Sequence, residues 1–261
     1  MKTLLAFSGG LDSSFLAWWT LAFKKDELHC FFMDLADVTY DTPEGPKPYY
    51  NDLNAAEKIA APRVIEWLNN NVRPVTFEIT DEVKYEVPPE DFPKGTARSW
   101  RVYPMLKYAA RIVTERGFDR FIYGKSPENI RSEDWKLRRD WYQKWWKENA
   151  PEGTTFETPL IRRHQGRPHA LLLLPEELLP LVLTCNDPGI VDGNPVACGH
   201  CDKCMLTVEA KQLLPGLKYN PDPVLEILLQ RRKAGDYIGN ESIRGDHRYG
   251  ADHVPKKLPN A

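Results

Sequence analysis

Short apolar segments alternate with longer amphipathic ones along the first two-thirds of the chain. The apolar segments predict strands at 2–7, 28–35, 73–80 and 119–124, with a further strand near 170–174. The amphipathic segments predict helices at 12–23, 53–70, 102–116, 133–148 and 176–183. Strands that alternate with helices are typical of a parallel sheet covered by helices on both faces. We therefore expect an α/β fold.

The remainder of the chain has a different pattern. Two more helices are predicted at 203–213 and 222–234, and the residues beyond them carry few apolar side chains. The proline-rich segment 43–48 is expected to be a loop. We expect three regions: an α/β domain over 1–183, a small helical region over 184–234 and an extended tail over 235–261.

The first junction between a strand and a helix carries the chemically most informative residues. It reads Ser8-Gly9-Gly10-Leu11-Asp12-Ser13-Ser14 and follows the apolar Leu4-Leu5-Ala6-Phe7. Glycines let the backbone approach an anion closely, and the N–H groups and positive dipole end of a helix then hold it. Serine hydroxyls add donors. We therefore predict a phosphate loop over 8–14, exposed as a surface turn; the alternative is an ordinary tight turn in which Asp12 or Ser13 caps the helix.

This string also matches the SGGxDS signature of the PP-loop ATP pyrophosphatases, which split ATP between its α and β phosphates and adenylate a substrate. It is neither a Walker loop nor a dinucleotide-binding G-x-G-x-x-G. The resemblance implies that residues 8–14 bind ATP, that Asp12 and Ser13 are catalytic, and that Asp12 is a Mg²⁺ ligand. Adenine would lie beside the end of the second strand, at Met33 and Asp34.

Four of the five cysteines follow a C-x12-C-x2-C-x2-C pattern: Cys185, Cys198, Cys201 and Cys204. Four thiolates can close a tetrahedral site, which is a usual form of structural zinc, and an iron–sulfur cluster is the main alternative. Disulfides are disfavoured, because the chain begins with a predicted strand rather than a secretion leader. Cys30 lies in an apolar stretch and is expected to be a small buried side chain.

Composition narrows the classes of function. The chain has 261 residues, with 35 lysines and arginines against 37 acidic residues, so no global basic field points to a nucleic acid. No apolar run approaches the length of a membrane span. We expect a soluble cytoplasmic protein that acts on a small molecule.

With both motifs placed, the chain resembles the 7-cyano-7-deazaguanine synthase family. Thr184-Cys185-Asn186-Asp187 and the compact Cys198-Gly199-His200-Cys201-Asp202-Lys203-Cys204 carry the resemblance, together with the Pro159-Leu160-Ile161 step. It implies an ATP-dependent carbon–nitrogen ligase that turns 7-carboxy-7-deazaguanine and ammonia into the nitrile through an acyl-adenylate. The implied cofactors are ATP, Mg²⁺ and Zn²⁺, and a homodimer is the implied assembly.

The middle of the chain matches this family less closely. Asp34 is followed by Leu35-Ala36-Asp37 rather than an Asp-Tyr-Gly-Gln turn, and a serine follows Arg98 where the family has asparagine. These departures bear on the substrate more than on the ATP chemistry. The candidates for phosphate or carboxylate contacts are Lys125, Arg98 and Arg138, the alternative for each being an exposed surface charge.

Other residues receive a structural interpretation. Glu57 is expected to be an exposed helix residue rather than a site contact. Four tryptophans are expected to pack a helix against the core rather than stack on a purine-like ring: Trp135, Trp141, Trp145 and Trp146.

Two further functions stay open. One is another PP-loop adenylating enzyme, such as an amide-forming relative, a tRNA thiolase or a lysidine-type synthetase. The other is a non-catalytic protein that binds a nucleotide and acts as a partner module. The intact SGGLDSS string favours retained ATP chemistry over the partner module.

Overall fold

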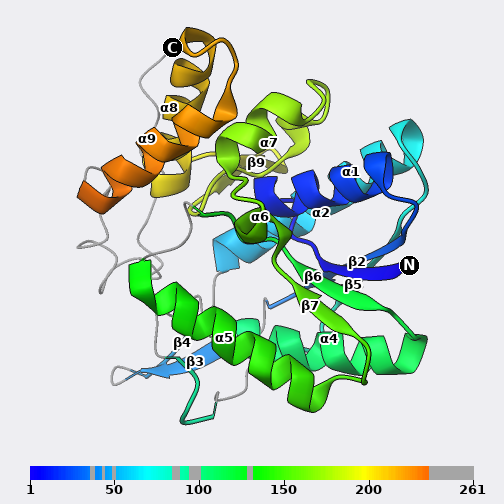
Figure 1. Ribbon diagram of the computed structural model, residues 1–261. Helices are drawn as coiled ribbons and strands as arrows, with labels where there is room; N and C mark the ends of the chain where they lie inside the picture. The colour runs from blue at the N-terminus through cyan, green and yellow to red at the C-terminus, as the bar shows by residue number, and fades with distance from the viewer. Residues whose placement is uncertain are drawn as a thin grey trace.

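A five-stranded parallel sheet forms the centre of the computed structural model, which describes residues 1–35, 39–42, 45–48, 51–83, 89–93, 101–127 and 132–234. The strand order is β5-β2-β1-β6-β7, and every pairing in this sheet is parallel (Figure 1). The strands are β1 (Lys2–Ala6), β2 (Glu27–Met33), β5 (Thr76–Thr80), β6 (Arg120–Tyr123) and β7 (Thr155–Glu157). The expected α/β fold is therefore confirmed.

Helices cover both faces of the sheet (Figure 1). One face packs against α1 (Leu11–Phe23), the second half of α2 (Asn51–Asn71) and α7 (Arg167–Leu173). The other packs against α4 (Val102–Arg116) and α5 (Ser132–Asn149). Because strand side chains alternate between the faces, Leu4 enters one core and Leu5 the other.

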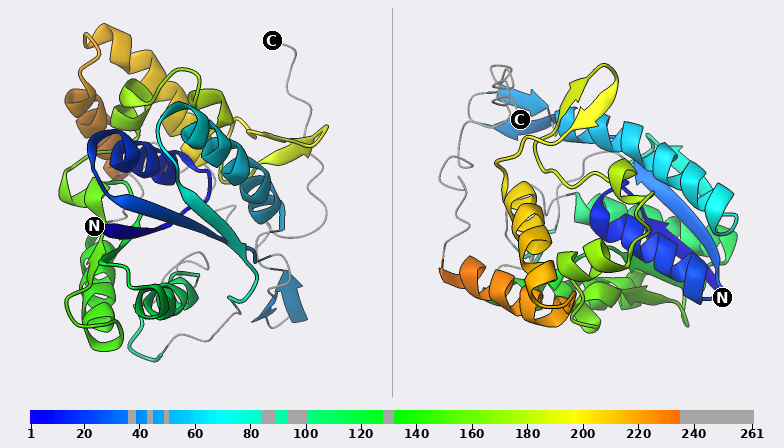
Figure 2. Two further views of the ribbon diagram at one scale, coloured as in Figure 1. Left: turned by 90° about the vertical axis from the view of Figure 1, so that its right-hand side faces the viewer. Right: turned by 90° about the horizontal axis from the view of Figure 1, so that it is seen from above.

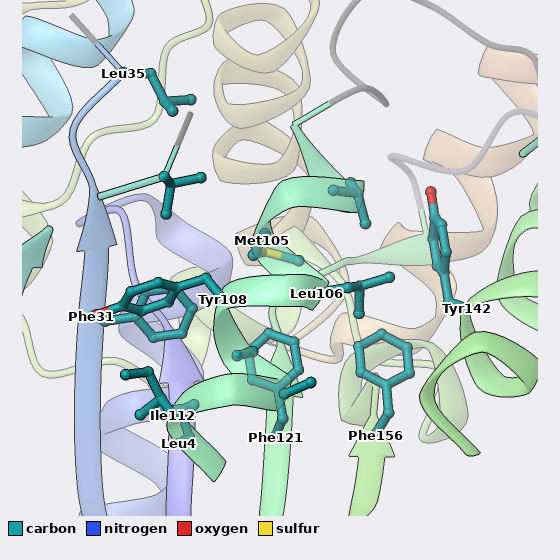
Figure 3. Packing of buried hydrophobic residues seen from close by; sticks show 14 of the residues in the cluster. Leu4, Phe31, Leu35, Met105, Leu106, Tyr108, Ile112, Phe121, Tyr142 and Phe156 are labelled. Carbon is teal, nitrogen blue, oxygen red and sulfur yellow. The ribbon is translucent and has the colours of Figure 1, made fainter. Parts of the chain in front are cut away.

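Several aromatic side chains pack together in the core under α4 and α5. Phe31, Phe121 and Phe156 come from three strands and meet Leu106 and Tyr142 of the two helices (Figure 3). The ring of Trp146 on α5 stacks on Phe121 with centroids 5.3 Å apart. Trp141 and Trp145 also pack against this core, so the predicted packing role of these three tryptophans is confirmed. The side chain of Trp135 lies outside the described residues.

The C-terminal part is helical, as expected from its sequence. Here α7, α8 (Asp202–Gly216) and α9 (Pro221–Ala234) pack together around a small apolar core. Between α7 and α8, β8 (Gly189–Val191) and β9 (Asn194–Val196) form a hairpin that lies beside α2 (Figure 2). Arg63 on α2 holds the tip of this hairpin by donating to the side-chain oxygen of Asn194, 2.9 Å away. The tail expected over 235–261 lies outside the described residues.

Three of the predicted elements are wrong. Residues 170–174, expected as a strand, lie mostly in α7, because Pro168 in its first turn favours a helix start and the apolar residues pack against other helices. Residues 176–183, expected as a helix, contain only the 3₁₀ turn η2 (Leu179–Leu181), since Pro180 lacks an N–H donor. The proline-rich loop expected at 43–48 contributes instead to a hairpin of β3 (Thr39–Thr42) and β4 (Gly45–Pro48).

Besides the hairpin of β8 and β9, two more short elements were not predicted. They are β7 and α6 (Pro159–Arg162), each only a single turn or a few residues long. Among the described residues, no helix is both long enough and apolar enough to cross a membrane.

The aromatic core yields a test of the packing. Phe121→Ala should lower the free energy of unfolding by about 3–5 kcal/mol, because it removes a fully buried ring and leaves a cavity. Chemical denaturation measures this change. Leu137→Ala on α5 is the control: this side chain is 66% exposed, so its truncation should shift stability by about 0.5 kcal/mol or less. Equal effects of the two changes would contradict the packing.

Candidate functional site

The phosphate loop lies at the carboxyl end of the central strand. From β1 the chain builds the sheet toward β2 and β5, and then returns to the other side of β1 with β6 and β7. Where the strand order reverses in this way, open α/β sheets bind their ligands in a crevice at the carboxyl edge, which is here expected beside β1. The loop that enters α1 is therefore where a nucleotide is expected.

Gly9 lets this loop lie directly against α2. Its φ of +66° is in the left-handed region, and a Cβ on it would lie 2.6 Å from the amide nitrogen of Ala61. On the other side, a Cβ on Gly124, directly after β6, would lie 3.2 Å from the amide nitrogen of Ser13. The loop is thus held between α2 and the end of β6.

Hydrogen bonds within the loop fix its shape. The Ser13 hydroxyl donates to the Gly10 carbonyl at 3.1 Å and accepts from the Ser8 N–H at 3.3 Å. Gly10 is the N-cap of α1, and no side chain caps this helix end. The alternative in which Asp12 or Ser13 caps the helix is therefore wrong, and the first N–H groups of α1 keep no side-chain partner at the cap.

The serines of the loop differ in exposure. Ser8 is partly exposed, whereas Ser13 and Ser14 are buried, at 5% and 0% exposed. The expectation that Ser13 lies on a surface turn is thus wrong, because its hydroxyl bonds the loop from inside. Ser14 lies deeper, on the core side of α1. Leu11 is buried in the core under α1, so only its backbone belongs to the site.

Asp12 connects the loop to the segment after β6. Its carboxylate accepts a hydrogen bond of 3.1 Å from the hydroxyl of Ser126, which is fully buried. The candidate Lys125 lies between Gly124 and Ser126, and both of these neighbours contact the phosphate loop. Ser126 was not identified from the sequence, since only the fold brings it to Asp12.

Charged groups gather around Tyr123, the last residue of β6. Burial raises the pKa of its phenol. The charged groups that also act on this pKa are Arg101, Asp12, Glu57 and Arg138. We call these four residues and Tyr123 the Tyr123 group. The predicted Asp12 and Arg138 thus act on the same phenol as Arg101, which no local sequence signal indicated.

Glu57 is not the exposed residue that the helix pattern predicts. It is 5% exposed, and its carboxylate lies 3.6 Å from the guanidinium of Arg101. The first half of α2 packs against the core under α4, so its inner face carries Glu57 toward the crevice. Arg98 lies outside the described residues, and its expected role stays a prediction.

The expected adenine contacts lie at the end of β2, beside the loop. Met33 packs against the core under α4. The Asp34 carboxylate accepts from the side-chain amide of Asn54 at 2.7 Å and from the ammonium of Lys58. The Asn54 side-chain oxygen in turn accepts from the Leu35 N–H. Helix α2 therefore fixes the backbone at Leu35, where the sequence begins to depart from the family that the chain resembles.

The four predicted cysteines form one cluster, with all of their sulfurs within 4.8 Å of one another. The Sγ–Sγ distances are 3.5 Å for Cys185–Cys198, 3.8 Å for Cys185–Cys201 and 3.5 Å for Cys201–Cys204. These exceed a disulfide bond of about 2.05 Å, and all five cysteines are free thiols. Cys30 lies apart and fully buried, as expected, and burial raises the pKa of its thiol.

These distances fit one metal ion. Four sulfurs placed tetrahedrally at about 2.3 Å from an ion lie about 3.8 Å apart. A cubane iron–sulfur cluster holds its cysteine sulfurs much farther apart, because four iron atoms lie between them. The Asn186 N–H donates to the Cys201 sulfur at 3.4 Å, and the Cys198 N–H donates to the Cys185 sulfur at 3.3 Å. Such hydrogen bonds stabilise the thiolates that bind a metal. A hydrogen bond from Cys185 is the main cause that lowers the pKa of Cys198, to about 6.

A backbone contact joins this cluster to the phosphate loop. The Leu183 N–H donates to the Gly9 carbonyl at 2.9 Å, and Leu183 also forms a β-bridge with Gly10. Cys185 follows only two residues later. The segment that carries the first thiolate therefore also supports the loop.

Comparisons with known proteins add little. No protein-family model matches the chain, and no curated protein matches it in sequence. Among solved structures it is similar to the U34-tRNA thiolase NcsA from Methanococcus maripaludis, solved with its 4Fe-4S cluster. The identity is 16% and the TM-score 0.45, over 88% of this chain and 72% of that chain.

The contact of Gly9 with α2 yields a matched test. Gly9→Ala should weaken the binding of a non-hydrolysable ATP analogue and lower stability by more than Gly153→Ala does. Both glycines have positive φ, but a Cβ on Gly153 meets nothing within 4 Å, so that change carries only the backbone strain of about 1–2 kcal/mol. Calorimetry and chemical denaturation measure both effects. Indistinguishable variants would argue against the tight loop.

Proposed function

We propose that the chain is a PP-loop ATP pyrophosphatase that adenylates a carboxylate and holds a structural zinc ion. The observation that carries this proposal is the position of the SGGLDSS loop: it lies at the carboxyl end of the central strand, where the sheet order reverses, and α1 has no side-chain cap there. The uncapped helix end supports an anion site, and the SGGxDS signature supports the phosphates of ATP as the anion.

The chemistry follows from the reacting groups. A carboxylate is a poor electrophile, because its leaving group would be oxide. Transfer of AMP from ATP gives it a good leaving group and releases pyrophosphate. The loop would hold the pyrophosphate portion through its N–H groups and stabilise the charge that grows on it. Mg²⁺, with Asp12 as a protein ligand, would neutralise phosphate charge, since it prefers one or two carboxylates together with phosphate oxygens.

We infer further that the carboxylate is 7-carboxy-7-deazaguanine and that ammonia attacks the acyl-adenylate. Attack by ammonia gives the amide, and a second activation would drive its dehydration to the nitrile. The sequence resemblance supports this substrate, through the cysteine segment and the phosphate loop together. A tRNA thiolase or a lysidine-type synthetase would need a tRNA-binding surface, and the net charge of −2 disfavours it.

The products of the reaction test this function. Protein incubated with ATP, Mg²⁺, ammonium and 7-carboxy-7-deazaguanine should release pyrophosphate and AMP and form the amide or nitrile, detected by mass spectrometry. Asp12→Asn is the matched control: it keeps the side-chain shape but loses the charge for Mg²⁺, so pyrophosphate release should fall to background in a folded protein. The proposal fails in its specific form if ATP turns over without a deazaguanine product, and the loop assignment fails if Asp12→Asn is fully active.

The metal can be identified separately. Purified protein should be colourless and contain about one zinc per chain, because the sulfur spacing suits a single tetrahedral ion. Elemental analysis measures the content. Cys201→Ser should lose the metal, whereas Cys30→Ser should retain it, since Cys30 lies outside the cluster. A brown protein that contains iron and sulfide would overturn the assignment in favour of a cluster.

A further inference from the structure

The burial of the Glu57 carboxylate costs free energy. A carboxylate that is only 5% exposed loses most of its hydration, and this loss is offset only when a partner compensates its charge. The partner is Arg101, whose NH1 lies 3.6 Å from the Glu57 carboxylate. A close charge-assisted hydrogen bond is shorter, at about 2.7–2.9 Å. The pair is therefore better suited to orient Arg101 than to stabilise the fold.

Arg101 is more exposed than Glu57. It directly precedes α4, and its side chain stays 29% exposed, while that of Glu57 is covered. A planar guanidinium has five N–H donors, and they suit a carboxylate or a phosphate. One side of Arg101 faces Glu57, and part of its side chain is exposed to solvent.

The charges and contacts around Arg101 relate it to the phosphate loop. The Tyr123 group unites Arg101 and Arg138 with Asp12 around one phenol. Tyr123 directly precedes Gly124, which packs on the backbone of Asp12 and Ser13. Glu57, which Arg101 faces, lies one turn before the residues of α2 that contact Gly9, so Arg101 lies near the phosphate loop.

We propose that Arg101 binds the carboxylate of the acceptor substrate and that Glu57 is a positioning residue that holds Arg101 for this contact. The inference rests on the adenylating function proposed above. Arg101 would bind one carboxylate oxygen, while the other attacks the α-phosphorus. A carboxyl O–P bond then forms, the bond from the α-phosphorus to the bridging oxygen breaks, and pyrophosphate leaves with that electron pair. Arg101 exchanges no proton in this step.

Steady-state kinetics of pyrophosphate release test this role. Arg101→Ala should raise the KM for 7-carboxy-7-deazaguanine by about 10- to 100-fold, the loss expected for a hydrogen bond between charged groups. The KM for ATP should stay within about twofold, because the phosphate loop remains intact. Glu57→Gln keeps the side-chain volume and should shift the same KM in the same direction by a smaller factor. Arg111→Ala, an exposed arginine on α4 that pairs with Glu82, is the control and should change neither constant.

The outcomes separate this inference from the function on which it rests. Wild-type protein that releases no pyrophosphate with this carboxylate would refute the proposed function itself. Active wild-type protein with an unchanged carboxylate KM in Arg101→Ala would refute only the role of Arg101. An equal rise in the KM for ATP would assign Arg101 to the nucleotide instead. If Arg101→Ala fails to fold, Arg101→Lys serves in its place, because it keeps the charge but loses the planar fork, and it should still raise the carboxylate KM.

Discussion

The backbone of Gly9 lies directly against the backbone of α2, and the geometry of the site depends on this contact. A Cβ on Gly9 would come within 2.6 Å of the Ala61 nitrogen, so a larger residue would push the phosphate loop away from the helix. The carbonyl of the same glycine accepts the Leu183 N–H, two residues before the first cysteine of the cluster. One residue thus sets the distance between the loop, the helix and the segment that leads to the four thiolates.

Helix α2 also positions other residues of the site. One turn before the contact with Gly9 lies Glu57, which faces Arg101, and another turn before it Asn54 holds the end of β2 through Asp34 and Leu35. The expected nucleotide site and the proposed carboxylate site are therefore fixed by successive turns of a single helix. Leu35, the first of the loosely matching residues after Asp34, is therefore held by the same helix that contacts the phosphate loop.

Local signals predicted much of this structure, and long-range contacts account for the errors. The phosphate loop and three of the four thiols lie in short stretches of sequence, so their chemistry was evident without the fold. The strand predicted near 170–174 was wrong because a short apolar run has no period that separates a strand from a buried helix. Glu57 was assigned to the surface because its partner Arg101 is distant in sequence, and only the fold brings the two charges together. Ser126 on Asp12 was missed for the same reason.

Exchange of labelled pyrophosphate into ATP tests the central claim most directly, because it reports reversible cleavage of the bond between the α and β phosphates. The protein is incubated with ATP, Mg²⁺, labelled pyrophosphate and 7-carboxy-7-deazaguanine, with ammonium left out. The account predicts that label enters ATP, and that it does so only when the carboxylate is present. Formation of ADP and phosphate without exchange would show cleavage between the β and γ phosphates, and would contradict the account.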